Sequence, residues 1–143
     1  FGNGGSACDS QHMAAELVGR FQKERAGLPA VALTADTAVL TSVGNDYGFD
    51  MIFRRQIEAL GQTGDAAVGI STSGNSPNVV AGMEAARRKG LKTIALTGEG
   101  GGRLAALADI CITVPSRVTA RVQESFLLIE HMICEMVENE FSK

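Results

Sequence analysis

Two histidines and one glutamate could form either a metal site or a proton-transfer pair. His12 and His131 are the only histidines among the 143 residues, and Glu16 lies four residues after His12, on the same face of a predicted helix. His131 lies on a second predicted helix that also carries Gln123 and Glu124. Imidazole nitrogens and a carboxylate suit Zn²⁺, whereas Glu16 and His131 alone would suit acid–base work beside a carbonyl. Spacing does not bring the two helices together, so each histidine could also simply cap or pack on a helix surface.

The stretch at 69–78 has the composition of a phosphate-binding loop. It follows an apolar run at 65–70 and precedes a helix-forming run at 79–89, with Pro77 where the first helical turn begins. A helix N-terminus offers unpaired N–H groups and the positive end of the helix dipole, and hydroxyl donors add to this anion site. A polar loop with one capping serine is the plainer alternative, but four hydroxyls exceed what a cap requires. These hydroxyls define the serine loop (71–76) and belong to Ser71, Thr72, Ser73 and Ser76.

The glycine-rich segments at 2–6 and 98–102 do not match a nucleotide-binding pattern. Neither gives G-x-G-x-x-G within a full βαβ unit followed by a ribose-binding acid, and the P-loop pattern is absent. A sugar phosphate is therefore a better expected ligand than a nucleotide.

Composition argues against several other classes of protein. The length fits one domain, and the net charge of −3, with no cluster of cations beyond 87–89, argues against nucleic acid as a partner. No apolar run reaches the length of a membrane span. Cys8, Cys111 and Cys134 show no paired spacing, which indicates neither disulfides nor a cysteine zinc site. We therefore expect a cytoplasmic protein that binds neither nucleic acid nor membrane.

Alternating helices and short apolar strands predict an α/β fold with a parallel sheet covered on both faces. We expect one domain over 1–143, built as a three-layer, doubly wound sheet. The chain opens at Phe1 inside a glycine-rich turn, which predicts a missing N-terminal segment with an upstream strand. Ligands of such sheets bind beyond the carboxyl ends of the strands, where the loops 2–6, 44–48, 71–76 and 97–102 would lie. Helices are expected near 6–24, 50–60, 78–89, 103–107 and 119–140, and strands near 30–33, 66–70, 93–97 and 109–114.

Five blocks of the sequence stand out together, at 3–6, 11–17, 44–49, 69–76 and 121–124. In this order they closely resemble the phosphoheptose isomerase family, whose members carry a sugar isomerase (SIS) domain, and the resemblance spans nearly the whole chain. It implies a flavodoxin-like SIS domain. It also implies an aldose–ketose isomerase that converts D-sedoheptulose 7-phosphate to D-glycero-D-manno-heptose 7-phosphate, the first step of ADP-heptose biosynthesis.

The resemblance further implies the residues of the site, position by position. Glu16 and His131 would be the proton-transfer pair, and zinc would be held by His12, Glu16, Gln123 and His131. The family forms homotetramers with active sites at subunit interfaces, which implies the same assembly here. The implied substrate contacts are Asn3, Gly4, Gly5, Glu16, Asn45, Asp46, Ser71, Thr72, Ser73, Ser76 and Gln123.

An enediolate mechanism follows from this resemblance. Glu16 would take the proton from C1 and His131 would shuttle protons at the sugar oxygens, while zinc would polarise those oxygens and the serine loop would hold the phosphate. Two conflicts stay open. A carboxylate bound tightly to zinc is a poorer base, and Gln123 and His131 are eight residues apart, about 12 Å along a straight helix. Proton transfer without a metal is therefore an alternative.

The main rival interpretation comes from the same superfamily. SIS proteins that associate with the bacterial replication initiator resemble this chain in fold and in much of the serine loop, but they are binding proteins rather than isomerases. Their pattern lacks a glutamate at the Glu16 position and a histidine at the His131 position, whereas this chain has both. The sequence therefore favours the enzyme over a non-catalytic binding protein.

Overall fold

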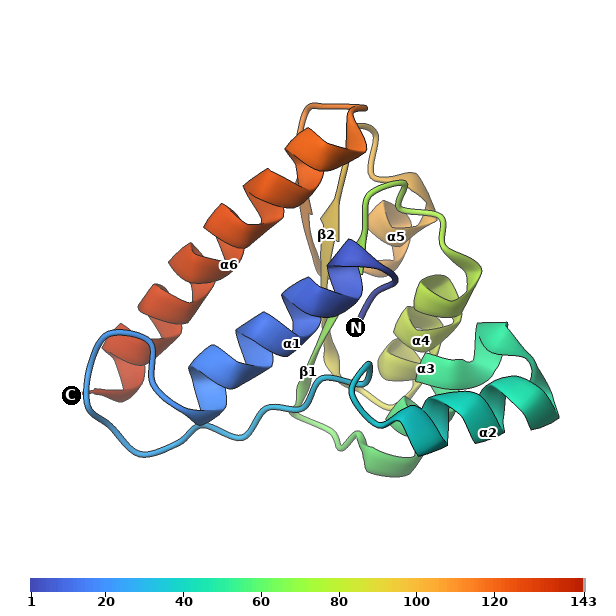
Figure 1. Cartoon of the computed structure of the whole chain (residues 1–143), viewed down its shortest axis with the longest axis horizontal. Coiled ribbons are helices and arrows are strands. Elements are labelled where there is room, and N and C mark those ends of the chain that lie inside the picture. Colours follow the sequence, from blue (N-terminus) through green and yellow to red (C-terminus); the bar gives the residue numbers. More distant parts are fainter. Residues whose placement is uncertain (143) are drawn as a thin grey trace.

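A parallel sheet lies between two layers of helices (Figure 1). The computed structural model describes residues 1–142. Its strands are hydrogen-bonded in their order along the chain, and all are parallel: β1 (Ala66–Ser71), β2 (Lys92–Thr97) and β3 (Ile110–Thr113). Gly2 forms a bridge to Ile70 on the other side of β1. This arrangement confirms the three-layer α/β class that the sequence predicts.

The helices divide between the two faces of the sheet. Figure 1 shows two long helices side by side over one face, α1 (Gly5–Val18) and α6 (Thr119–Phe141). The remaining helical elements lie on the opposite side: α2 (Thr37–Tyr47), the 3-10 turn η1 (Phe49–Met51), α3 (Ile52–Leu60), α4 (Pro77–Arg88) and α5 (Gly102–Leu107). Among these, α3 packs on α4, and α2 packs on η1 and α3.

The strands form because short apolar runs are buried from both sides, as is usual in parallel sheets. Ile70 on β1 and Leu96 on β2 are at most 1% exposed. They belong to a core cluster with Val122 and Phe126 of α6, on the face that α1 also covers. A larger cluster on the other face includes Phe53 and fills the space under α3 and α4. α6 is therefore held on the sheet by its own apolar face.

The strand predicted at 30–33 is wrong, because this segment is irregular chain. Leu33 is buried, but its carbonyl accepts a hydrogen bond from the side-chain amide of Gln56 at 2.9 Å rather than from a strand. The apolar run is thus buried by packing against α3.

The first two helices also differ from the prediction. α1 ends at Val18 rather than near residue 24, and Gly19 follows it. α2 lies where no helix was expected and takes in most of the loop predicted at 44–48. Its N-cap Asp36 accepts a bond from the backbone N–H of Val39 at 3.0 Å. The other predicted helices and strands are confirmed to within a few residues.

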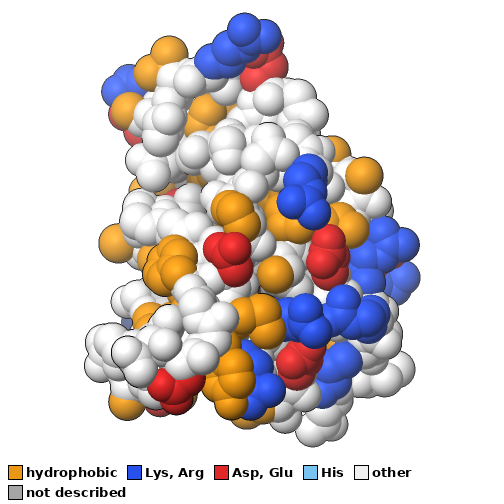
Figure 2. Space-filling model, turned by 90° about the vertical axis from the view of Figure 1, so that its right-hand side faces the viewer, with side chains coloured by type: hydrophobic (Ala, Val, Ile, Leu, Met, Phe, Trp, Pro, Cys, Tyr) orange, Lys and Arg blue, Asp and Glu red, His pale blue; other side chains and the backbone are white. Residues whose placement is uncertain are grey.

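The outer face of α3, α4 and α5 carries paired charges. Arg54 and Arg88 both contact Glu58, at 2.8 and 3.5 Å, and Arg103 contacts Glu84 at 3.5 Å. Figure 2 shows Lys and Arg side chains gathered beside acidic ones on this face. Within residues 1–142, no helix has both the length and the apolar character that crossing a membrane requires.

Candidate active site

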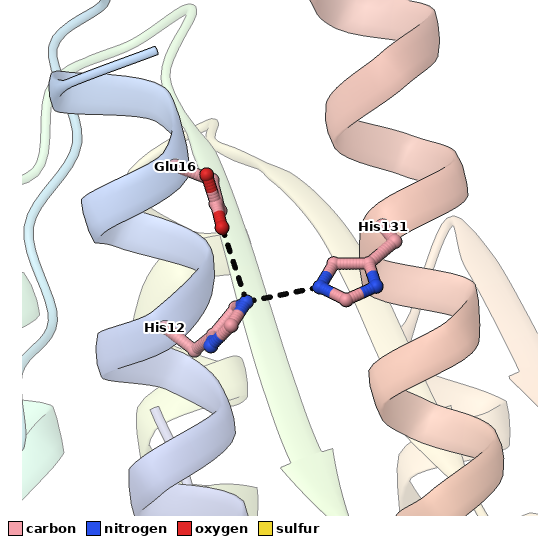
Figure 3. Close-up of side chains that lie close together, drawn as sticks. All are labelled: His12, Glu16 and His131. Carbon is pink, nitrogen blue, oxygen red and sulfur yellow. Dashed lines mark hydrogen bonds and ion pairs between the residues drawn. The ribbon is translucent and has the colours of Figure 1, made fainter. Parts of the chain in front are cut away.

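The two histidines and Glu16 come together between α1 and α6. His12 Nε2 lies 3.0 Å from His131 Nε2 and 3.3 Å from Glu16 Oε1 (Figure 3). One ligand atom from each of the three residues lies within 4.8 Å of the others. The structure therefore unites, across two helices, the residues that the sequence could place only on separate ones.

This cluster has the donor set and spacing of a metal site. His12 Nε2 lies close to both His131 Nε2 and Glu16 Oε1 but can carry only one hydrogen. One of the two contacts therefore has no hydrogen bond, whereas a metal ion bound between the three residues would interact with all of them. Two nitrogen ligands at 2.0–2.1 Å from a tetrahedral Zn²⁺ lie about 3.3–3.4 Å apart, close to the separation of the two Nε2 atoms. Glu16 is a quarter exposed, and His12 is 41% exposed, so solvent reaches the cluster. These residues fit a metal with an open position.

α1 and α6 run in the same direction, which aligns their residues in pairs. Gly5 lies beside Gln123 near the start of both helices, and His12 lies beside His131 about two turns later. A Cβ atom on Gly5 would fall 2.2 Å from Gln123 Nε2. Gly5 is therefore required for the close approach of the Gln123 side chain, which lies at the helix starts rather than in the histidine cluster.

The serine loop joins β1 to α4 with its hydroxyls turned toward one another. Ser71 Oγ lies 2.9 Å from Ser76 Oγ and 3.4 Å from Ser73 Oγ. Ser76 is the N-cap of α4, yet its side chain makes no capping bond, so its hydroxyl is not used to close the helix. A hollow of about 400 Å³ adjoins Thr72 and Ser73, and Arg117 lies on it in an ion pair with Glu99. The loop thus offers hydroxyls and a helix N-terminus to an anion.

The glycine-rich loop at 97–102 and the start of α5 pack against the serine loop. The carbonyl of Gly74, which has φ 65°, accepts a bond from the N–H of Leu104, and Asn75 Oδ1 accepts one from the N–H of Arg103, both at 3.0 Å. A Cβ on Gly74 would fall 2.1 Å from the carbonyl oxygen of Gly101. The first turn of α5, together with the 97–102 loop that is predicted as one of the ligand-side loops, therefore holds the serine loop in shape.

The segment before α1 is tied to the start of α4. The side-chain amides of Asn3 and Asn78 exchange two hydrogen bonds of 2.8 Å. Asn78 is 1% exposed, and its Oδ1 also accepts from the N–H of Val79. Asn3 and Gly4 are thereby held next to the serine loop, at the carboxyl edge of the sheet. Asn78 is a residue of this site that sequence reasoning missed, although it directly follows Pro77.

Comparison with known proteins decides the family. A family model described as an SIS domain matches residues 1–98. A phosphoheptose isomerase of Geobacter sulfurreducens is 59% identical over 137 residues, which cover 96% of this chain and 72% of that protein. The chain belongs to the phosphoheptose isomerase family.

Two solved structures of the family share the fold described above. A phosphoheptose isomerase from Francisella tularensis has a TM-score of 0.92 at 43% identity and covers 96% of this chain and 74% of that one. Another, from Neisseria gonorrhoeae, has a TM-score of 0.91 at 49% identity, with 97% and 74% covered.

Two residues that the family resemblance implies are not brought to this site. Asn45 and Asp46 lie near the end of α2, both exposed, and Asn45 Nδ2 donates to Asp46 Oδ1 at 2.8 Å. α2 packs on η1 and α3, on the side of the sheet away from α1 and α6. The chain therefore presents Asn45 and Asp46 to solvent, outward from its own histidine cluster.

Asp9 on α1 and Glu130 on α6 are acids with buried oxygens that lack a hydrogen-bond partner within the described residues. Glu130 is fully buried, and neither of its carboxylate oxygens has a hydrogen-bond partner within the described residues. Burial, and after it the carboxylate of Asp9, raise the pKa of Glu130 to about 8. Burial also raises the pKa of Asp9. Sequence reasoning gave no sign that Glu130 is buried, because a glutamate on a helix is usually exposed.

Proposed function

We propose that this chain is an aldose–ketose isomerase that interconverts D-sedoheptulose 7-phosphate and D-glycero-D-manno-heptose 7-phosphate, the first step of ADP-heptose biosynthesis. The observation that carries the proposal is the meeting of His12, Glu16 and His131 between two helices of a member of the phosphoheptose isomerase family. The relatives and solved structures of 43–59% identity that carry this enzyme name support the same activity.

The reaction moves one proton from C1 to C2, and the barrier is the weak acidity of a C–H bond beside a carbonyl. Glu16 would remove the C1 proton, leaving an enediolate, and return a proton to C2. His131 would donate a proton to the oxygen on C2 and accept one from the oxygen on C1, so the overall reaction gains and loses no atom. A positioned base and acid of this kind contribute roughly 10²–10⁴-fold in rate.

The serine loop would hold the phosphate at the far end of the substrate. Gly5 at the start of α1 and His12 are seven residues apart, a rise of about 10 Å along the helix. The helix starts and the histidine cluster are thus separated by a length on the scale of a phosphorylated seven-carbon sugar, whose C1 would lie at the cluster and whose phosphate would lie at the loop. Phosphate contacts would come from Ser71, Thr72, Ser73 and Ser76, and sugar contacts from Asn3, Gly4, Gly5 and Gln123.

Zinc is the metal that we propose for the cluster, held by His12, Glu16 and His131. Glu16 would have to bind the metal weakly, or leave it during turnover, to act as the base. When bound, it would polarise the sugar oxygens at C1 and C2. The resemblance adds Gln123 as a fourth ligand. Because Gln123 lies beside Gly5 and about 12 Å along α6 from His131, we favour a substrate contact for Gln123 of the same chain.

We further propose a cytoplasmic homotetramer whose sites are completed across interfaces. Asn45 and Asp46 face solvent on α2, away from the histidine cluster of their own chain. They would therefore contact substrate bound at a neighbouring subunit.

Turnover of sedoheptulose 7-phosphate by the full-length protein tests the function. We expect activity in the wild type, a fall of roughly 10²-fold or more in Glu16→Gln and in His131→Ala, and little change in Glu135→Gln, which alters an exposed glutamate on the same helix. In D₂O, deuterium should enter C2 of the product, because the proton on Glu16 exchanges with solvent.

Metal dependence is measured on the same proteins. A chelator should lower kcat of the wild type, and added Zn²⁺ should restore it, whereas His12→Ala should not be restored. An unaffected, fully active chelated enzyme would favour proton transfer without metal. A well-folded, zinc-supplied tetramer with no turnover would overturn the isomerase and favour the SIS protein that associates with the replication initiator.

A further inference from the structure

A buried carboxylate on α6 organises the loop that follows α1. Glu138 is 1% exposed and accepts hydrogen bonds from the backbone N–H groups of Phe21, Gln22 and Lys23 at 2.8–2.9 Å. Arg25 Nε lies 3.2 Å from the same carboxylate, and both side chains are almost fully buried. Burial alone would raise the pKa of Glu138, but the three N–H donors and Arg25 lower it. Glu138 is therefore an ionised anchor for residues 21–25.

Arg25 connects this anchor to the end of α1. Its guanidinium donates to the carbonyl of Glu16 at 2.8 Å and to that of Leu17 at 2.9 Å. The last carbonyls of a helix lack partners within the helix, and Arg25 supplies one to the carbonyl of Glu16. The carbonyl of Leu17 also accepts a bond from the backbone N–H of Leu28 at 2.9 Å. Because the last turns of α1 carry Glu16, Arg25 and Glu138 together fix the backbone from which the base of the cluster projects.

The anchored loop also places an aromatic ring against His131. The rings of Phe21 and His131 have centroids 5.5 Å apart, and on another side the His131 ring faces His12 at 5.1 Å. The backbone of Phe21 is held by Glu138, which lies seven residues after His131 on the same side of α6. Phe21 is thus fixed at its backbone by the carboxylate and at its ring by the imidazole.

We propose that Phe21, Arg25 and Glu138 are positioning residues for the histidine cluster. The Arg25–Glu138 pair orders the loop, and the Phe21 ring limits the orientations that the His131 imidazole can adopt. None of the three touches the reacting atoms. The prediction that these residues affect turnover rests on the proposed function. The prediction that they orient the His131 ring does not.

The test combines kinetics with NMR of the histidine rings in the full-length protein. In ¹³C-histidine-labelled protein, His131→Ala identifies the ring signals of His131, because these are the signals that the variant lacks. We expect Phe21→Leu and Glu138→Gln to move the His131 signals, although Glu138 does not contact that ring. Both variants should lower kcat by roughly tenfold with little change in KM, because small misplacements of catalytic groups reduce the rate. Glu135→Gln and Phe141→Leu, which alter exposed side chains of α6, should do neither.

Two results would overturn the proposal. One is a folded Glu138→Gln protein whose His131 signals match those of the wild type, and the other is displaced signals with an unchanged kcat. Should Glu138→Gln fail to fold, Phe21→Leu decides, since it removes no hydrogen bond. A wild type without turnover would defeat the proposed function instead, and displaced His131 signals in both variants would still support the positioning.

Discussion

The absence of a side chain at Gly5 leaves room for the side chain of Gln123. A Cβ at this position would fall 2.2 Å from Nε2 and 2.8 Å from Cδ of Gln123, which are the far end of a flexible side chain. Gly5 begins α1, and its φ is not positive, so alanine fits the backbone there. The side chain of Gln123, rather than the fold, would have to move.

We therefore expect Gly5→Ala to reduce activity without loss of stability. The free energy of unfolding should change by less than about 1 kcal/mol, because alanine suits a helix better than glycine. Displacing Gln123 should lower kcat/KM for sedoheptulose 7-phosphate by roughly tenfold or more. Thermal melting and steady-state kinetics measure the two effects.

A double-mutant cycle checks that the effect passes through Gln123. In the Gln123→Ala background, Gly5→Ala should cause no further loss, because the displaced side chain is gone. Full additivity of the two losses would contradict this account and indicate that Gly5 contacts the substrate directly.

Among the elements, those set by local pattern could be predicted and those set by packing could not. β1, β2 and the serine loop before α4 follow from a buried apolar run, hydroxyls and Pro77, all within a few residues of each other. The pairing of α1 with α6 depends on contacts between segments more than 100 residues apart, so spacing alone left the histidine cluster undecided. The segment at 30–33 has the apolar pattern of a strand, but its partner is the Gln56 side chain rather than a strand.

The β2–β3 edge of the sheet offers a prediction on pH and stability. Asp109 precedes β3 and accepts bonds from the backbone N–H of Thr93 at 2.8 Å and from its hydroxyl at 3.1 Å. These two bonds lower the pKa of Asp109, first through the backbone N–H and then through the hydroxyl. The carboxylate therefore stabilises the fold above the pKa of the unfolded chain, and this contribution is lost as the pH falls through the lower pKa of the folded state.

Asp109→Asn should accordingly have a lower melting temperature than the wild type at pH 7. The difference should shrink as the pH falls from 3.8, the ordinary pKa of aspartate, through the lower pKa of the folded state, since the unfolded chain and then the folded protein take up the proton. Thermal unfolding across pH 3–7 measures this. An equal difference at every pH would show that the asparagine acts through shape rather than charge.

At the scale of the whole molecule, α6 exposes an apolar stripe that one chain does not cover. Leu128, Met132 and Met136 are four residues apart and lie on one side of the helix, with exposures of 63%, 55% and 71%. Contiguous apolar surface of this kind marks contact with another protein. The stripe lies next to the face of α6 that carries His131. A neighbouring subunit bound to the stripe would therefore lie close to the histidine cluster and could complete the site.

Charged substitution in this stripe should therefore break the proposed tetramer and lower turnover together. We expect Leu128→Lys and Met136→Lys to reduce the molar mass measured by light scattering after size-exclusion chromatography. Activity should fall in parallel, because Asn45 and Asp46 of a neighbour would no longer reach the substrate. Ile110→Lys, which alters an apolar residue of similar exposure on β3, is the matched control and should leave both unchanged. A Met136→Lys protein that stays tetrameric and fully active would place the subunit contact elsewhere on the molecule.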